Sequence, residues 1–234
     1  MFHLASSLYS HYTKREQYNV LILGLDNAGK TTFFEHLKML YQIPDELAET
    51  RKKKQGDEVD TVDALKHKRI LPTVGQNTTT IKFELTNPLE VVKGKGGRSI
   101  LLKFWDLGGQ QLLRLMWLRY YDQCHGIVFI IDLTDTDRFQ ECYDTIVDIA
   151  HHNAWEGVVN VPILMLANKQ DLPQAVDLVQ LKTGVFIQLV LELEATDSKL
   201  LPVLVLENQG LREALEWLVL RLVYNKGNRP PDYR

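Results

Sequence analysis

The chain has 234 residues, of which 45% are hydrophobic and 24% are charged, and its net charge is −3 at pH 7. This length and apolar content are enough for one well-buried core, so we expect a single domain. The small net charge excludes a global field that would attract nucleic acid, and no nucleic-acid partner is expected.

Residues 1–16 are predicted to form an amphipathic helix. At the angular spacing of a helix, apolar side chains occupy one arc and polar side chains fill the rest. The apolar arc consists of Phe2, Leu4, Ala5, Leu8, Tyr9 and Tyr12. Such a helix could lie on a membrane or fold back on the core. No apolar stretch approaches bilayer-spanning length and no secretory region follows Met1, so we expect a cytosolic protein or one on a membrane surface.

Apolar, β-rich runs alternate with helix-like stretches along the rest of the chain. The runs predict strands at 18–25, 78–85, 99–107, 126–133, 161–168 and 200–206, with helices at 30–41, 112–122, 137–153, 177–194 and 210–225. This alternation is typical of an α/β sheet covered on both faces. No helix pattern separates 78–85 from 99–107, so one strand is expected to be antiparallel.

The predicted domain covers residues 17–226, with insertions at about 42–70 and 86–98, and residues 227–234 are expected to be a C-terminal tail. The segment 42–68 is charged and lacks steady apolar periodicity, so we expect it to be exposed. Cys124 and Cys142 have no metal-ligand spacing and are predicted to be core thiols of a reducing compartment.

A phosphate-binding loop follows the first strand, because residues 24–31 read Gly-Leu-Asp-Asn-Ala-Gly-Lys-Thr. Glycines at the two ends of such a loop let the backbone curl so that N–H groups face the β-phosphate, and the next helix points its positive end there. Lys30 adds a charge and Thr31 a hydroxyl ligand for Mg²⁺. The alternative is an ordinary strand–turn–helix corner. The predicted nucleotide contacts are Asp26, Asn27, Ala28, Gly29, Lys30, Thr31 and Thr32.

The strand at 99–107 ends in the run Trp-Asp-Leu-Gly-Gly-Gln at 105–110. Asp106 is predicted to hold Mg²⁺ through water, Gly109 to offer its N–H to a γ-phosphate, and Gln110 to orient the attacking water. Thr73, in Pro-Thr-Val-Gly, is the predicted second hydroxyl ligand, available when a triphosphate pulls that loop inward. An ordinary turn threonine is the alternative.

The run Asn-Lys-Gln-Asp at 168–171 follows an apolar strand and predicts the contact to the base. Asp171 can accept hydrogen bonds from the guanine N1–H and amine, which adenine does not offer. Asn168 can reach the Hoogsteen edge, and Lys169 can lie along the ring. A buried carboxylate left unpaired would reject adenine, so the pattern favours GTP and GDP.

Together these motifs resemble the Arf and Arf-like small GTPases, and most of all their Golgi Arf-related branch. The resemblance implies the Ras-like P-loop NTPase fold, a doubly wound, six-stranded mixed sheet with one antiparallel strand. It implies a GTP/GDP switch with Mg²⁺, whose inter-switch hairpin slides in register and releases the N-terminal helix. Hydrolysis is expected to be slow without an activating protein.

The same resemblance implies where the protein acts and with what. We expect a monomer that is cytoplasmic and peripheral on the trans-Golgi membrane, where it regulates vesicle trafficking. Its expected partners are an exchange factor, a GTPase-activating protein, an integral Golgi membrane receptor, and effectors or tethers. The family's myristoyl anchor requires glycine at the second position, and Phe2 excludes it.

The chain also departs from the family pattern. Gln76 stands where an effector-contacting phenylalanine is usual, leaving Trp105 and Tyr120 as the matching members of that surface. Leu204 and Val205 replace the polar guanine-closing element, although the backbone N–H of Val205 could still meet the guanine carbonyl. The alternatives are a non-hydrolysing guanine-nucleotide-dependent scaffold and an ATP-using P-loop kinase.

Overall fold

The computed structural model describes residues 15–41, 70–85, 98–152, 155, 161–184, 186–187, 189 and 197–234. The strands are β1 (Glu16–Leu23), β2 (Gln76–Leu85), β3 (Arg98–Leu107), β4 (Gly126–Asp132), β5 (Ile163–Asn168), β6 (Ser198–Pro202) and β7 (Asp232–Tyr233). The α-helices are α2 (Lys30–Tyr41), α6 (Leu118–Tyr121), α7 (Phe139–Ala150), α8 (Leu178–Thr183) and α10 (Leu211–Tyr224). The predicted N-terminal helix up to residue 14, and the insertions at 42–69 and 86–97, lie outside the described residues.

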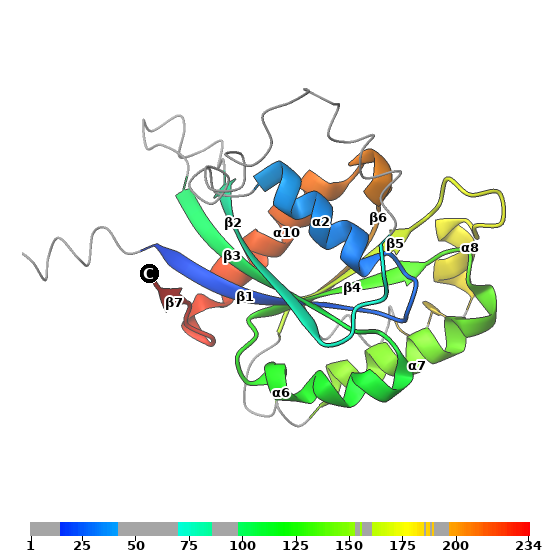
Figure 1. The fold of residues 1–234 in the computed structure, drawn as a ribbon, viewed down its shortest axis with the longest axis horizontal. Coiled ribbons are helices and arrows are strands. Elements are labelled where there is room, and N and C mark those ends of the chain that lie inside the picture. The colour runs from blue at the N-terminus through cyan, green and yellow to red at the C-terminus, as the bar shows by residue number, and fades with distance from the viewer. Residues whose placement is uncertain are drawn as a thin grey trace, which may run out of the picture.

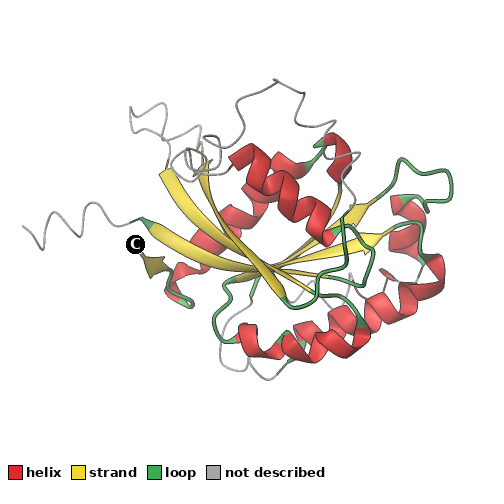
Figure 2. Ribbon diagram, viewed as in Figure 1, coloured by secondary structure: helices red, strands yellow, loops and turns green. Residues whose placement is uncertain are grey.

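The strands form one twisted mixed sheet in the order β2-β3-β1-β4-β5-β6, shown in Figures 1 and 2. β2 runs antiparallel to β3, whereas β3 and β4 both run parallel to β1 and the remaining pairs up to β6 are parallel. The predicted mixed α/β sheet with antiparallel β2 is therefore confirmed. β1 lies in the middle of the sheet, so the loop that follows it opens at the centre of the carboxyl edge.

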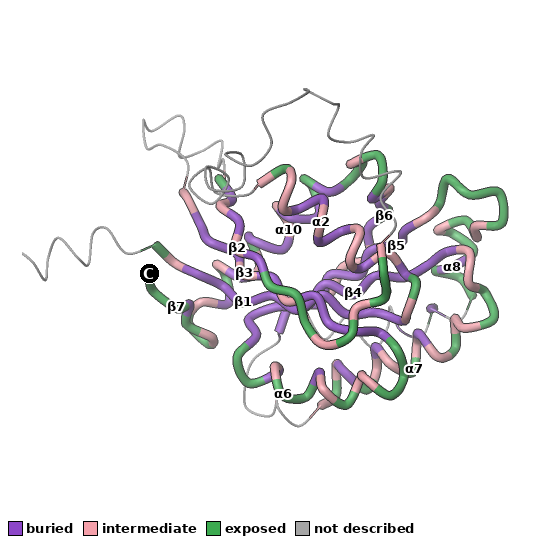
Figure 3. Tube along the Cα trace, in the orientation of Figure 1, coloured by how far each residue is buried: buried purple, intermediate pink, exposed green. Residues whose placement is uncertain are grey.

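Helices cover both faces of the sheet, with α2 and α10 on one side and α6 and α7 on the other (Figure 1). Successive side chains of β1 point to opposite faces of the sheet and so pack alternately into the two helix layers. Val20 and Ile22 pack with α2 and α10, whereas Leu21 and Leu23 pack with α7. Burial on both faces explains why the central strands are continuous apolar runs (Figure 3).

Three predicted elements end earlier or fold differently than expected. The helix predicted at 112–122 is a 3₁₀ turn, Gln111–Met116, followed by the short α6, and Leu112 is 90% exposed. The helix predicted at 177–194 is interrupted, because α8 ends at Thr183 before Gly184; residues 186, 187 and 189 are helical again, and 185, 188 and 190–194 lie outside the described residues. The strand predicted at 200–206 ends at Pro202, which has no N–H for a further ladder bond, and Val205–Glu207 form a 3₁₀ turn.

The C-terminal segment at 227–234 returns to the start of β1, where β7 pairs with Glu16 and Gln17, which β4 does not reach. Arg15 and Arg234 exchange two backbone hydrogen bonds of 2.7 and 3.0 Å. Arg229 donates to the carbonyl oxygens of Tyr121 and Asp122, both at 2.7 Å. The segment predicted as a tail is thus part of the sheet. The sequence did not predict this strand, because β7 has only two residues and so shows no apolar periodicity.

His125, with a neutral imidazole ring, holds this returning segment in place. Its Nδ1 accepts a 3.0 Å hydrogen bond from the Asn19 N–H, so Nε2 carries the proton and donates to the Pro230 carbonyl at 2.9 Å. Burial lowers the pKa of His125, because the charged ring would lose water; the Pro230 carbonyl and the charge of Asp232 oppose this shift without cancelling it. Protonation of Nδ1 would also cost the bond from Asn19.

We therefore expect the stability of the fold to fall as the pH drops below about 6.5, the pKa of histidine in an unfolded chain. The folded pKa is depressed, so the unfolded chain binds the extra proton and is favoured at low pH. Melting temperatures measured between about pH 8 and 5 should show a flatter loss in His125→Gln than in the parent chain. His151→Gln, at an exposed histidine, is the matched control. Identical pH profiles for the parent and His125→Gln would contradict the assignment.

Candidate nucleotide-binding site

The loop between β1 and α2 depends on glycine at two positions. Gly24 has a φ of 139°, and an added Cβ would lie 2.4 Å from the Ile130 carbonyl oxygen. Gly29 has a φ of 98°, and its Cβ would lie 2.5 Å from Nδ2 of Asn168. Asn27 also adopts a left-handed φ of 64°. The loop is thus wound tightly against β4 and β5, as a phosphate-binding loop requires.

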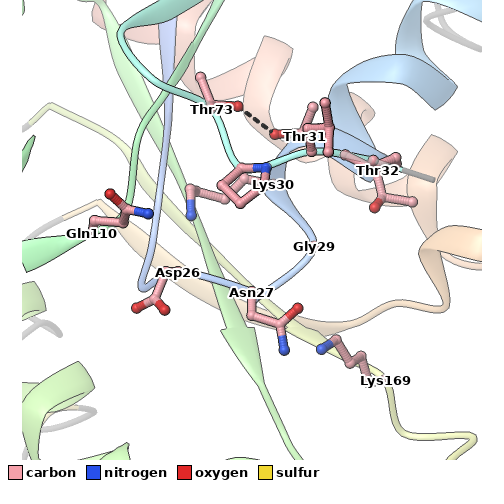
Figure 4. A pocket seen from close by; sticks show the side chains of 13 residues that line it. Asp26, Asn27, Gly29, Lys30, Thr31, Thr32, Thr73, Gln110 and Lys169 are labelled. Atoms are coloured by element: carbon pink, nitrogen blue, oxygen red, sulfur yellow. Dashed lines mark hydrogen bonds between the residues drawn. The ribbon is translucent and has the colours of Figure 1, made fainter.

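A pocket opens over this loop and gathers most of the residues predicted to contact the nucleotide (Figure 4). The predicted residues that line it are Asp26, Asn27, Gly29, Lys30, Thr31, Thr32, Thr73, Gly109, Gln110 and Lys169. Ala28, Asp106 and Asn168 are buried behind it, and Asp171 is exposed outside it. The segments that meet here are far apart in the sequence: they lie after β1, before β2, after β3 and after β5.

Lys30 is buried at the base of the pocket and donates a 2.6 Å hydrogen bond to the Leu25 carbonyl. Burial lowers its pKa to about 8, and the charges of Asp106 and Asp26 oppose that shift. A Cβ on Gly109 would lie 2.3 Å from the Lys30 Nζ. The backbone of Gly109 therefore lies as close to Lys30 as only a residue without a Cβ can, and Gly109 lines the pocket beside it.

The three predicted metal ligands converge. Thr31 Oγ1 lies 2.9 Å from Thr73 Oγ1 and 2.9 Å from Asp106 Oδ2, and Thr73 Oγ1 lies 3.2 Å from the same carboxylate oxygen. Asn77 donates to that oxygen at 3.1 Å, while Oδ1 of Asp106 is buried without a partner. Burial raises the pKa of Asp106. Two hydroxyls beside a carboxylate with an unsatisfied oxygen fit Mg²⁺, which prefers oxygen ligands and retained water.

The Thr73 hydroxyl lies against Thr31 and Asp106, so the segment before β2 reaches the phosphate loop. Gly108 stands next to it, and a Cβ there would come within 2.7 Å of the Thr73 carbonyl. The segments before β2 and after β3 are therefore in direct contact beside the metal-ligand cluster.

Two contacts that hold the loop after β3 were not predicted from the sequence. Arg114 donates from Nε to the Gly109 carbonyl at 2.9 Å and pairs with Glu141 at 2.8 Å. Trp117 donates from Nε1 to the Gly108 carbonyl at 3.0 Å. The Arg114 side chain is only 16% exposed, so it is held in the packing between the loop and α7. No local signal could have found it, since its partners lie on another helix and a loop.

At the other end of the pocket, Asn168 clamps two loops together. It donates to the Ala28 carbonyl at 3.0 Å and accepts from the Val205 N–H at 3.3 Å. The Val205 N–H, which could have met the guanine carbonyl, is thus directed to Asn168. Lys169 has a left-handed φ of 64° and pairs with Asp132 at 2.6 Å, a partner the sequence analysis did not single out.

A central phosphate loop, two hydroxyls with a carboxylate at its rim and an asparagine clamp on the base side together define a small GTPase of the Ras-like fold. The model of the ADP-ribosylation factor family matches residues 4–222. The chain belongs to this Arf family, whose small GTPases bind GTP and GDP with Mg²⁺ and hydrolyse GTP.

Individual relatives agree. ADP-ribosylation factor-like protein 3 of Saccharomyces cerevisiae is 42% identical over 234 residues, the whole of both chains. ADP-ribosylation factor-related protein 1 of Rattus norvegicus is 35% identical, with all of this chain and 98% of the relative covered. The Arl6 BBS3 small GTPase from Trypanosoma brucei, solved with bound GppNp, shares the fold at a TM-score of 0.64. It is 22% identical and covers 89% of this chain and 99% of its own.

Proposed function

We propose that this protein is an Arf-like GTP/GDP switch that is recruited to Golgi membranes and regulates vesicle trafficking there. Mg²⁺, when bound, neutralises charge on the phosphates. Thr31 and Thr73 would hold the metal directly and Asp106 through water. The remaining roles are phosphate binding by Asp26, Asn27, Ala28, Gly29, Lys30 and Thr32, γ-phosphate sensing by Gly109, water positioning by Gln110, and guanine recognition by Asn168, Lys169 and Asp171.

One observation carries the switch proposal: the segments beside the predicted terminal-phosphate site also present exposed apolar side chains. Leu71 and Val74 flank Thr73 and are 69% and 84% exposed. Leu112 and Leu115 follow Gln110 and are 90% and 76% exposed. Because each segment both contacts the pocket and presents apolar surface, loss of the terminal phosphate would change what an effector meets.

The neighbouring surface of β2, β3 and α6 carries a polar side chain, Gln76, beside two aromatic rings. Tyr120 packs against Trp105, with ring centroids 5.3 Å apart, and donates a hydrogen bond to Gln76. The two aromatic residues expected on the effector surface therefore lie together, and Gln76 offers an amide where an aromatic ring is usual. Effectors of this chain would have to match that amide.

Membrane recruitment would use two signals, because one short amphipathic helix binds a bilayer only marginally. The first is the apolar arc of residues 1–16, and the second is an integral membrane receptor of the Golgi. Among the described residues no helix is both long and apolar enough to cross a bilayer. An exchange factor and a GTPase-activating protein complete the proposed cycle.

Flotation with membranes tests this proposal. The chain loaded with GppNp or GDP is mixed with Golgi-enriched membranes, with the same membranes after protease treatment, and with protein-free liposomes of their lipids. We expect about tenfold more GppNp-loaded than GDP-loaded protein on intact membranes, and loss of the excess after protease. Leu4→Ser with Leu8→Ser should abolish binding, whereas Ser6→Ala with Ser10→Ala, on the polar arc, should not. Equal recruitment of both forms would contradict the proposal.

A further inference from the structure

The phosphate loop contains a carboxylate that faces the nucleotide pocket. Asp26 lines the pocket together with Lys30 and Gln110, and in Figure 4 its side chain lies on the same side as those two. Its charge is close enough to oppose the lowering of the Lys30 pKa that burial causes. A negative charge at this place would repel a polyphosphate, and GTP more than GDP, because GTP carries the additional terminal phosphate.

The Asp26 carboxylate forms an ion pair with Arg138, which is 112 residues away in the chain. This arginine ends the 3₁₀ turn Thr136–Arg138 that leads into α7, and it donates from Nη1 to Asp26 Oδ1 at 2.6 Å. A second donor, Nη2, reaches the Asp26 backbone carbonyl at 3.2 Å. One guanidinium thus holds both the side chain and the main chain at the tip of the phosphate loop.

The arginine is itself held in place. Its Nε donates to Asp135 Oδ2 at 2.7 Å, and Asp135 lies at the start of the same turn. Partial burial raises the pKa of Asp26, but the hydrogen bond and positive charge of Arg138 outweigh it and bring that pKa below its ordinary value. Asp26 is therefore ionised and paired, so its charge is compensated before a phosphate arrives.

We propose that Arg138 is a positioning residue that neutralises Asp26 and thereby sets the preference of the site for GTP over GDP. This inference rests on guanine-nucleotide binding at the site. The guanidinium pairs with the Asp26 carboxylate at the pocket, so the terminal phosphate meets Lys30 with that negative charge compensated. Removing Arg138 would free that charge in the pocket, and removing both charges together would restore the balance.

A double-mutant cycle separates this electrostatic role from a merely structural one. Affinities for GTP and GDP are measured by competition against a fluorescent GDP, at one Mg²⁺ concentration and about pH 7.5, for the parent chain and for Arg138→Gln, Asp26→Asn and the double variant. We expect Arg138→Gln to lower the ratio of GTP to GDP affinity about tenfold, the order expected for one charge pair about 4 Å apart in water. The double variant should recover the ratio to within about threefold.

Controls and a second variant keep the proposal open to refutation. Arg212→Gln removes an exposed arginine paired with Glu216 on α10 and should leave the ratio unchanged. If Arg138→Gln does not fold, Asp26→Asn alone should raise the ratio about threefold, because it removes a negative charge from the pocket while Arg138 stays paired with Asp135. An unchanged ratio in either single variant, or a double variant no better than Arg138→Gln, would overturn the proposal. Failure of the parent chain to bind either nucleotide would instead contradict the nucleotide site itself.

Discussion

Replacing Asp106 with asparagine is expected to lower the affinity for Mg²⁺ in the nucleotide-bound protein by about a hundredfold. The Asp106 carboxylate accepts from Thr31, Thr73 and Asn77, and its second oxygen is buried without a partner. An amide would lose the charge that attracts the cation. Its NH₂ group would also face either the donor cluster or the position of the metal-bound water.

The measurement is the release rate of a fluorescent GDP as a function of free Mg²⁺. The variant should require about a hundredfold more Mg²⁺ to slow release to half its metal-free rate. Glu84→Gln, an equally conservative change at an exposed carboxylate on β2, should behave like the parent chain. A parent-like Mg²⁺ dependence in Asp106→Asn would rule out Asp106 as the metal-orienting group.

Gln110→Leu is expected to reduce the single-turnover rate of GTP hydrolysis about a hundredfold or more, the size usual for loss of a group that assists proton transfer or orients water. Gln110 lines the pocket beside Lys30, directly after the Gly109 backbone that Arg114 holds in place. The leucine has no amide to orient a water molecule. It leaves the phosphate contacts intact, so GTP affinity should change by less than about threefold.

Hydrolysis is followed with pre-bound labelled GTP, both alone and with an Arf-family GTPase-activating protein. The neighbouring variant Gln111→Leu is the matched control, because Gln111 is exposed and does not line the pocket. Equal rates for Gln110→Leu and the parent chain would show that another group positions the water. A parent chain that binds GTP but never cleaves it, even with the activating protein, would favour the non-hydrolysing scaffold.

The sequence predicted those parts of the site that are contiguous in the chain. The loop at 24–31 requires glycine at two positions because its backbone must curl around the phosphates, and both glycines have left-handed φ values in the fold. Asp106 lies near the end of β3, Gly109 and Gln110 follow that strand, and Asn168 ends β5. The carboxyl-edge rule for parallel strands therefore placed them at the same edge of the sheet.

Other residues acquired their place only through packing. Val205, whose N–H could have met the guanine carbonyl, donates instead to Asn168. The predicted helix at 112–122 became a 3₁₀ turn and a short helix, because Arg114 and Trp117 bond to the carbonyls of Gly109 and Gly108 and tie this segment to the pocket. Apolar spacing describes which face is buried and carries no information about such polar contacts.

By itself, the sequence predicted the fold class, the phosphate loop and the three residues that converge as the candidate metal site. Each of these follows from backbone requirements and periodicities that act within one or two neighbouring elements. Only the tertiary structure decided that Arg138 pairs with Asp26, that β7 joins β1 and that Asn168 clamps the loops. These contacts join residues more than a hundred positions apart, and a hydrogen bond of that kind depends on where folding places its two ends.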